Sequence, residues 1–377
     1  MIRKTLKIFC ALALFTSCDN ELNITADWKD VPVVYGILNV EDSINYVKLN
    51  KVFLGQGDVI SMAQQFDSLY YNPDHVGLRL IESQLAGNQF TPIKTLEMEV
   101  VDDIIKPYGL FSSPSQIIYQ TDQVLNHLRH YTVEVYSKDS EEVIASNPIP
   151  IDLLKPLSMS SPNGFTPVNM VPDGYISKAE WVSIEGAKLY ELNVRFYYAE
   201  QQIADLSDVS YKSLNWSFPY RMSSSMSGGE NMSVNIDALQ FLTFLSSTID
   251  DNPNVYRQVQ GVQGTSGPSG FAITHSCLDF SLIAAGNDLS TYINLNENSN
   301  SIVVDRPEYT NILNSDGQEY VGIFSSRSNV FIDNIRLNNL SNDEIAFNEI
   351  TKHLNFAYFR AQTNDEDLLV IDTLYVD

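Results

Sequence analysis

The clearest strand pattern in the chain is Gly186-Ala-Lys-Leu-Tyr190-Glu-Leu-Asn-Val194-Arg-Phe196. Leu192, Val194 and Phe196 alternate with polar residues, which is typical of a strand with one buried face. Ala179-Glu-Trp181 comes shortly before it and ends in a large aromatic residue that can pack against this strand. The two segments together predict neighbouring β-strands that share a core.

More strands are expected on both sides of this block. In the first half, residues 32–53 have hairpin patterning, and strands follow at 76–83, 95–101, 131–136 and 143–150. In the second half, strands are predicted at 209–216, 271–284, 320–324, 330–337 and 368–376. Pro148, Pro150 and Pro156 cannot lie in a central strand, so a boundary is expected near residue 155.

A helical period interrupts the strands in four places. The spacing of apolar residues predicts short helices over residues 59–70 and 288–295. It also predicts a longer helix over residues 237–249, which Asp237 can cap. Ser341-Asn-Asp-Glu344 has the pattern of a capping box, which predicts a helix from there to about residue 352. Long loops are expected at 217–235 and 257–270.

Composition supports a folded, mainly β chain. Hydrophobic residues make up 44% of the 377 residues and charged residues only 19%, which indicates packed structure rather than disorder. The length suits two domains. We therefore expect two β-sandwich domains, one over residues 31–155 and one with short helical insertions over residues 156–377.

The N-terminus has the pattern of a bacterial lipoprotein signal peptide. Arg3, Lys4 and Lys7 precede an apolar run over residues 8–15, and the small residue Ser17 precedes Cys18. Such a run is too short to cross a hydrocarbon core of about 30 Å, and its flanks are those of a cleaved signal. The prediction is removal of residues 1–17, acylation of Cys18 with lipid such as palmitate, and a polar tether over residues 18–30.

The charge of the chain excludes one class of partner. The formal net charge is −24, and loss of residues 1–17 leaves 20 basic against 47 acidic residues, or −27. A surface that negative repels phosphate backbones, so no nucleic acid is expected as a partner. It also offers no polybasic patch for anionic lipid, so attachment to the membrane must come from the acyl chains on Cys18.

The sequence shows no motif for catalysis, a cofactor or a metal. Gly264-Thr-Ser-Gly-Pro268 has proline where a nucleophile elbow needs glycine, and it lacks the residues of a phosphate-binding loop. His127 and His130 directly precede a strand, where a solvated turn is the simpler interpretation. Cys277 lies in an apolar run, as a buried small residue would. We expect no enzyme, no cofactor and no metal.

Three aromatic residues form a candidate ligand platform. Tyr197 and Tyr198 extend past the predicted core strand, and Trp216 lies at a strand end. Exported proteins that bind glycans stack sugars on such rings. Tyr197, Tyr198 and Trp216 are therefore the residues expected to meet an oligosaccharide or peptide ligand at one end of the second domain.

The chain resembles a family of outer-membrane lipoproteins of the Bacteroidota type, of uncharacterised function and often encoded beside TonB-dependent receptors. The resemblance rests on the lipobox at Cys18, on Val33-Val34-Tyr35-Gly36, on residues 131–150, on the Trp181 and Tyr190 block, and on Tyr309-Thr-Asn-Ile-Leu-Asn314 followed by Gly322-Ile-Phe-Ser-Ser-Arg327. It implies an Ig-like domain followed by a fibronectin type III-like domain, and it supplies no catalytic residue. Asp19-Asn20-Glu21 partly matches the acidic signal for export to the cell surface in such proteins.

Three functions follow as expectations. The first is a non-enzymatic lipoprotein, lipid-anchored in the outer membrane and exposed on the cell surface, that serves as a binding or accessory subunit of a TonB-dependent nutrient transporter or another envelope protein. The second is an adhesion or structural lipoprotein. The third is a glycan-processing enzyme whose carboxylates meet only in the folded chain.

Overall fold

The computed structural model describes residues 31–52, 59–109, 111, 114–164, 166–205, 208–260, 277–297, 309–356, 358–363 and 369–374. The signal peptide, Cys18 and the tether lie outside the described residues, as does most of the loop expected at 257–270. The chain is mainly β, with 46% strand and 14% helix, and it forms several antiparallel sheets. The prediction of a mainly β fold is confirmed.

A ten-stranded sheet runs through the whole molecule. Its order along the main path is β13 (Val209–Ser217), β12 (Ala187–Gln202), β17 (Leu278–Gly286), β18 (Val321–Ile335), β1 (Val31–Leu38), β2 (Asn45–Val52), β6 (Ile118–Thr121) and β5 (Glu99–Val101). Two more strands, β14 (Arg221–Met222) and β16 (Val255–Val259), pair with β12. All pairs are antiparallel except β1 with β18, which is parallel.

Three smaller sheets complete the architecture. One contains β4 (Gln89–Glu97), β3 (Val76–Ala86), β7 (His130–Ser137), β8 (Val143–Ser146) and β9 (Ile151–Asp152). The second contains β10 (Met159–Ser161), β11 (Lys178–Val182) and β15 (Asn231–Asn235), and the third pairs β19 (Tyr358–Thr363) with β20 (Leu369–Leu374). The segment 217–235, expected to be a loop, thus contains β14 and β15.

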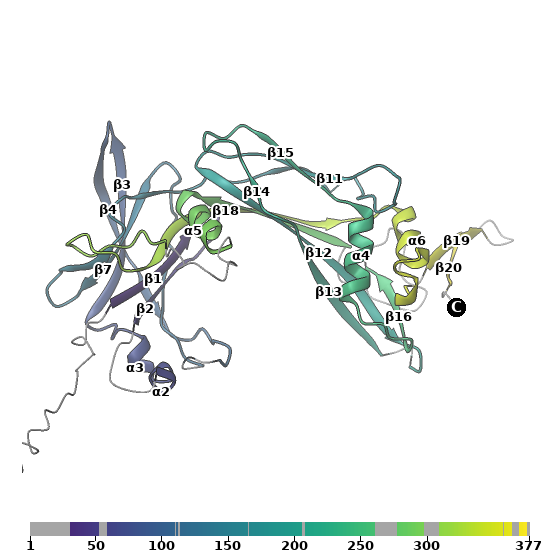
Figure 1. Cartoon of the computed structure of the whole chain (residues 1–377), viewed down its shortest axis with the longest axis horizontal. Helices are drawn as coiled ribbons and strands as arrows, with labels where there is room; N and C mark the ends of the chain where they lie inside the picture. The colour runs from purple at the N-terminus through teal and green to yellow at the C-terminus, as the bar shows by residue number, and fades with distance from the viewer. Residues whose placement is uncertain are drawn as a thin grey trace, which may run out of the picture.

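Short helices lie at both ends of the molecule, and α5 lies near the junction of its two halves (Figure 1). They are α2 (Val59–Ala63), α3 (Phe66–Leu69), α4 (Ala238–Thr248), α5 (Asn287–Glu297), α6 (Asn339–Phe347) and the 3₁₀ turn η2 (Lys352–Leu354). The Asp237 side chain accepts a hydrogen bond from the Gln240 amide at 2.9 Å, so its predicted capping role is confirmed. The predicted cap at Ser341 is wrong, because Asn338 caps α6 and accepts from the Ser341 amide at 2.8 Å.

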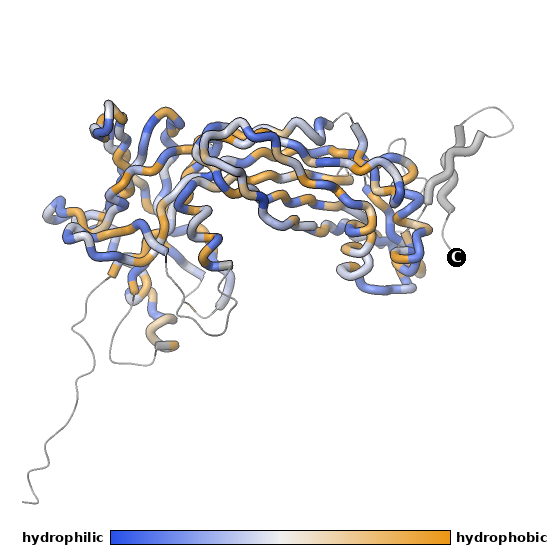
Figure 2. The backbone as a smooth tube through the Cα atoms, turned by 45° about the horizontal axis from the view of Figure 1, so that its top comes forward, coloured by the Kyte–Doolittle hydropathy of each residue, from blue (hydrophilic) through white to orange (hydrophobic). Residues whose placement is uncertain are grey.

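Two hydrophobic cores lie at opposite ends of the elongated molecule (Figure 1). In the first core, Val34 and Val47 of the long sheet pack with Leu80 and Val133 of the five-stranded sheet. Hydrophobic and hydrophilic residues alternate along the long strands, as Figure 2 shows, so one face of each strand supplies a core.

The second core is built around the block that opened the sequence analysis. Trp181 of β11 and Tyr190 of β12 are both buried, and their ring centroids lie 5.8 Å apart. The three-stranded sheet and helix α4 cover this face of the long sheet, with Phe241 of α4 stacked edge-on against Phe196. The predicted packing of Trp181 against its neighbouring strand is confirmed.

One strand belongs to both cores. The chain passes from the first core to the second between Leu153 and Leu154, but Ile312, Tyr320 and Phe324 return to the first core. Residues 320–324 and 330–337 were expected to be separate strands, yet β18 is continuous over 15 residues. Its first part pairs with β1 and its second part with β17, so β18 joins the halves that the sequence divides near residue 155.

Candidate functional site

A cleft of about 490 Å³ opens at the junction of the two cores. Most of its lining comes from three parts of the chain: residues 148–152 of the first core, the end of β17 with the start of α5, and residues 309–326. Gly186 and Met226 complete it. This volume lies in the range of small-molecule sites. The junction of the cores is therefore the best-formed candidate site in the part of the chain that the structure describes.

Strand β18 forms one side of the cleft with two buried serines. Ser325 Oγ accepts a hydrogen bond from the Leu289 amide at 3.0 Å, which holds the first turn of α5 in place. Ser326 Oγ donates to the Asp152 carbonyl at 2.6 Å and ties β9 to β18. A Cβ at Gly286 would come within 2.9 Å of Ser326 Oγ and 3.0 Å of its carbonyl, so only glycine fits this close approach.

Tyr309 and Asp288 form a polar pair on the cleft wall. The Tyr309 hydroxyl donates to Asp288 Oδ1 at 2.5 Å. Burial, followed by the hydrogen bond to the Asp288 carboxylate, raises the pKa of Tyr309 above its usual value. Tyr309 thus stays a neutral phenol at physiological pH. Asp288 lies in the first turn of α5, where the helix dipole favours its negative charge.

The segment that carries Tyr309 is fastened to the first half of the molecule. Asn311 Nδ2 donates to the Phe324 carbonyl at 2.7 Å, and Asn311 Oδ1 accepts from the Phe324 amide at 2.9 Å. Leu313 and Ser146 exchange two backbone hydrogen bonds at 2.8 and 2.9 Å. The cleft wall is therefore preorganised by fixed backbone pairing.

The charge of the cleft is negative. Asp152, Asp288 and Glu319 line it, and the described lining residues include no lysine, arginine or histidine. His130 Nδ1 lies 2.6 Å from Asp152 Oδ1 behind the lining. The cleft offers carboxylate and hydroxyl oxygens that accept or donate hydrogen bonds, and it disfavours an anionic ligand.

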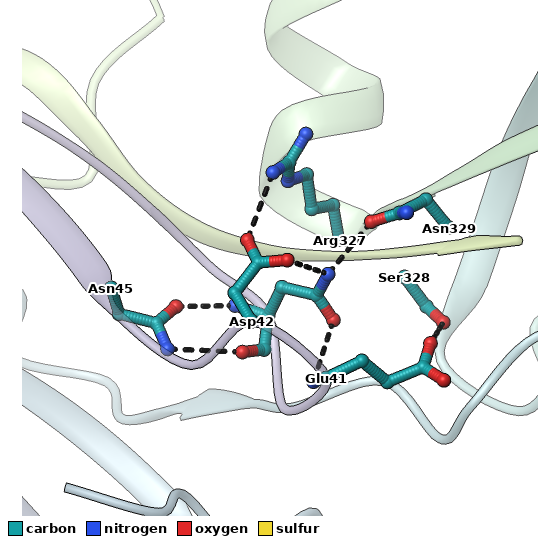
Figure 3. Close-up of polar contacts among 7 residues, drawn as sticks. Glu41, Asp42, Asn45, Arg327, Ser328 and Asn329 are labelled. Atoms are coloured by element: carbon teal, nitrogen blue, oxygen red, sulfur yellow. Dashed lines mark hydrogen bonds and ion pairs between the residues drawn. The ribbon is translucent and has the colours of Figure 1, made fainter. Parts of the chain in front are cut away.

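A polar junction made by residues 39–45 and 327–329 holds the β1–β2 turn against β18 (Figure 3). Arg327 Nη2 donates to Asp42 Oδ2 at 2.9 Å, and Asn39 Nδ2 donates to Asn329 Oδ1 at 2.7 Å. Asn39 and Asn45 exchange two hydrogen bonds that shape the turn. These contacts fix the geometry of the junction beside the cleft.

The predicted ligand platform is not formed. Tyr198 and Trp216 are buried in the second core, where Trp216 packs on Phe218 with a centroid distance of 4.3 Å. Tyr197 points to the other face of the sheet, because successive residues of a strand alternate, and its hydroxyl donates to Asp279 Oδ2 at 2.7 Å. Tyr197, Tyr198 and Trp216 therefore share no exposed surface.

Cys277, another residue considered in the sequence analysis, lies in the second core. Cys277 is buried, and burial raises the pKa of its thiol. In the described part of the chain, no group of three or more His, Cys, Asp and Glu side chains is placed to hold a metal ion. None of the described helices is both long and apolar enough to cross a membrane. Of the two expected contact loops, 217–235 reaches the cleft through Met226, whereas residues 261–270 of the other lie outside the described residues.

Sequence reasoning missed the cleft, although one signal pointed to it. Residues 325–329 are Ser-Ser-Arg-Ser-Asn, a polar run that looked like a loop between two strands. The run is in fact the middle of β18, with Ser325 and Ser326 at the cleft and Arg327 and Asn329 at the polar junction. Polar residues at buried strand positions were the available signal.

The chain matches no protein-family model and no curated protein. Its function therefore has to be inferred from its own residues and their geometry.

Proposed function

We propose that this chain is a non-enzymatic lipoprotein, acylated at Cys18 and held on the surface of the outer membrane, that binds a ligand in the cleft between its two cores. We further propose that it acts as a binding or accessory subunit of a TonB-dependent nutrient transporter. The observation that carries the binding role is the cleft itself, which is preorganised, negatively charged and lined by hydroxyl, amide and carboxylate groups.

These groups suit a neutral, polyhydroxylated ligand such as an oligosaccharide. Asp152, Asp288 and Glu319 can accept hydrogen bonds from sugar hydroxyls, and the Tyr309 ring offers an apolar face. A phosphorylated or carboxylated ligand would meet three carboxylates on a chain of net charge −24. A neutral or basic peptide satisfies the same chemistry and is the alternative ligand.

Binding is favoured over catalysis by what the carboxylates already do. Asp288 already accepts the hydrogen bond of the Tyr309 hydroxyl, which holds that carboxylate in place. Within this proposal the first half is an Ig-like sandwich and the second a fibronectin type III-like one. The two-layer packing of each core supports that assignment.

Titration calorimetry of the mature chain carrying Cys18→Ser, against neutral oligosaccharides and neutral or basic peptides, tests the ligand site. Asp288→Asn should weaken binding about 10- to 100-fold, because a hydrogen bond to a charged group is worth about 1.5–3 kcal/mol. Asp333→Asn removes an exposed carboxylate from the same strand as Ser325 and should leave binding unchanged. Equal affinities of both variants, or no binding of any ligand in the panel, would refute the site.

A pull-down from detergent-solubilised envelope tests the accessory role separately. Recovery of an outer-membrane transporter supports it. Recovery of no barrel, together with an attachment defect on deletion that no nutrient relieves, would favour the adhesion alternative.

A further inference from the structure

One end of the first half carries the start of the described chain. Strand β1 starts there at Val31, and Val31 pairs with Val52 at the end of β2. Helices α2 and α3 follow β2 at this end (Figure 1). The loop of residues 102–117 connects β5 to β6 at the same end, because Val101 pairs with Ile118 and Val47 pairs with Tyr119. We call this surface the proximal end.

The proximal end exposes large apolar side chains. In the loop, Ile105 is 79% and Tyr108 is 88% exposed, and Phe111 is also exposed. Ile60 of α2 is exposed as well. Exposed apolar residues also occur at the opposite end of this half, as at Val124 and Leu128, but the proximal end adjoins the segment that leads to Cys18. Aliphatic side chains together with tyrosine and phenylalanine are the residue types that enter the interfacial layer of a bilayer.

Lysines accompany these side chains. Lys106 Nζ lies 5.6 Å from the centroid of the Phe111 ring, and Lys51 Nζ lies 5.6 Å from that of Tyr71. Burial and the nearby charge of Lys48 lower the pKa of Lys106, which places Lys48 close to it.

The acidic residues Asp67, Asp102 and Asp103 belong to the same end and balance the lysines. The charges at this end therefore balance, and the apolar side chains are what would favour a membrane there.

We propose that the proximal end is a membrane seat, in which Ile105, Tyr108 and Phe111 of the loop, with Ile60 of α2, insert into the interfacial layer of the membrane that holds Cys18. This proposal rests on the proposed acylation of Cys18. Only the twelve residues 19–30 separate Cys18 from Val31, and a chain of that length spans at most about 40 Å. The second core lies at the opposite end of the elongated molecule (Figure 1).

Site-specific quenching tests the seat on the full lipidated protein. Tyr108→Cys and, as the matched control, Val124→Cys are each labelled with an environment-sensitive fluorophore. Val124 is 92% exposed in the same half, but it follows β6 at the opposite end of that strand. Cys277 is buried and Cys18 is acylated in the proposal, so neither competes for the label. The protein is reconstituted into vesicles of phosphatidylethanolamine and phosphatidylglycerol that contain a brominated quencher lipid.

The expected result is quenching at residue 108 that is at least about threefold stronger than at residue 124, because only the former enters the interface. Equal quenching in protein that floats with the vesicles would overturn the seat and leave the anchor standing. Protein that does not float would overturn the anchor and with it the seat. A shifted emission at residue 108 in concentrated protein without vesicles would identify a second copy of the chain as the occupant, and would also overturn the seat.

Discussion

The parallel pairing of β1 with β18 depends on a glycine. Gly322 has φ +128°, and a Cβ built there would lie 1.9 Å from the Val34 carbonyl oxygen. Val34 is the residue paired with Gly322 in the register. Gly322→Ala should therefore force the two strands apart at the only place where the N-terminal strand meets the C-terminal half of the long sheet within the described residues.

The cost can be worked out from this geometry. An alanine at this φ carries backbone strain of about 1–3 kcal/mol. A contact of 1.9 Å cannot be tolerated, so the strands must separate and lose at least two hydrogen bonds of about 1 kcal/mol each. The expected total is about 3–5 kcal/mol, a large share of the ~5–15 kcal/mol that stabilises a folded domain.

Hydrogen exchange followed by mass spectrometry measures this effect locally. Amide hydrogens in peptides that cover β1 should exchange faster in Gly322→Ala. The free energy of opening calculated from their exchange should fall by about 3 kcal/mol or more. Gly317→Ala is the control, since its φ is +79° but no atom lies within 4 Å of the new Cβ. That variant should cost only the strain of a left-handed residue, about 1–2 kcal/mol. Equal protection of β1 in the two variants would refute the reasoning.

Three further predictions concern stability. Tyr119, Tyr131 and Tyr198 are buried, and burial raises the pKa of each to about 12 from 10.0 in the unfolded chain. As the pH rises, these phenols ionise in the unfolded chain before they ionise in the folded one, which favours unfolding. The free energy of unfolding should therefore be unaffected by them below pH 10 and should fall as the pH rises from 10 to 12. Arg257→Met should cost about 3–5 kcal/mol in urea unfolding, because Arg257 is buried and Glu200 and the carbonyls of Leu354 and Asp250 would lose its hydrogen bonds. Asp237→Ala should cost about 1 kcal/mol through loss of the cap of α4.

Each of these predictions has a matched control or a contradicting result. A free energy of unfolding that stays flat from pH 10 to 12 would contradict the alkaline prediction. Arg195→Met removes an exposed arginine from β12 and should cost far less than Arg257→Met. Asp251→Ala, an exposed position just beyond α4, should leave stability unchanged, and a loss equal to that of Asp237→Ala would contradict the cap.

Local features of the fold could be predicted from the sequence. The alternation through Leu192, Val194 and Phe196 predicted β12 because one face of that strand is buried. The cap at Asp237 was predictable because it involves an amide only three residues away. The prediction of a capping box at Ser341 was wrong, because the side chain of Asn338, three residues earlier, is the acceptor that caps the helix.

Contacts between distant segments could not be predicted. The pairing of β1 with β18 joins the two ends of the chain, and neither strand carries a local mark of its partner. The cleft has the same origin, since Asp152, Asp288 and Tyr309 come from three separate segments. Tyr198 and Trp216 were misassigned because helix α4 and the segment around Phe356, which bury them, are remote in the sequence.

Intact-mass spectrometry of the protein extracted from the membrane fraction tests the central claim most directly, since the binding role at the envelope and the membrane seat both depend on the anchor. The account predicts a chain that begins at Cys18 and carries acyl chains on that residue. A chain that retains residues 1–17, or one that begins at Cys18 without acyl chains, would contradict it.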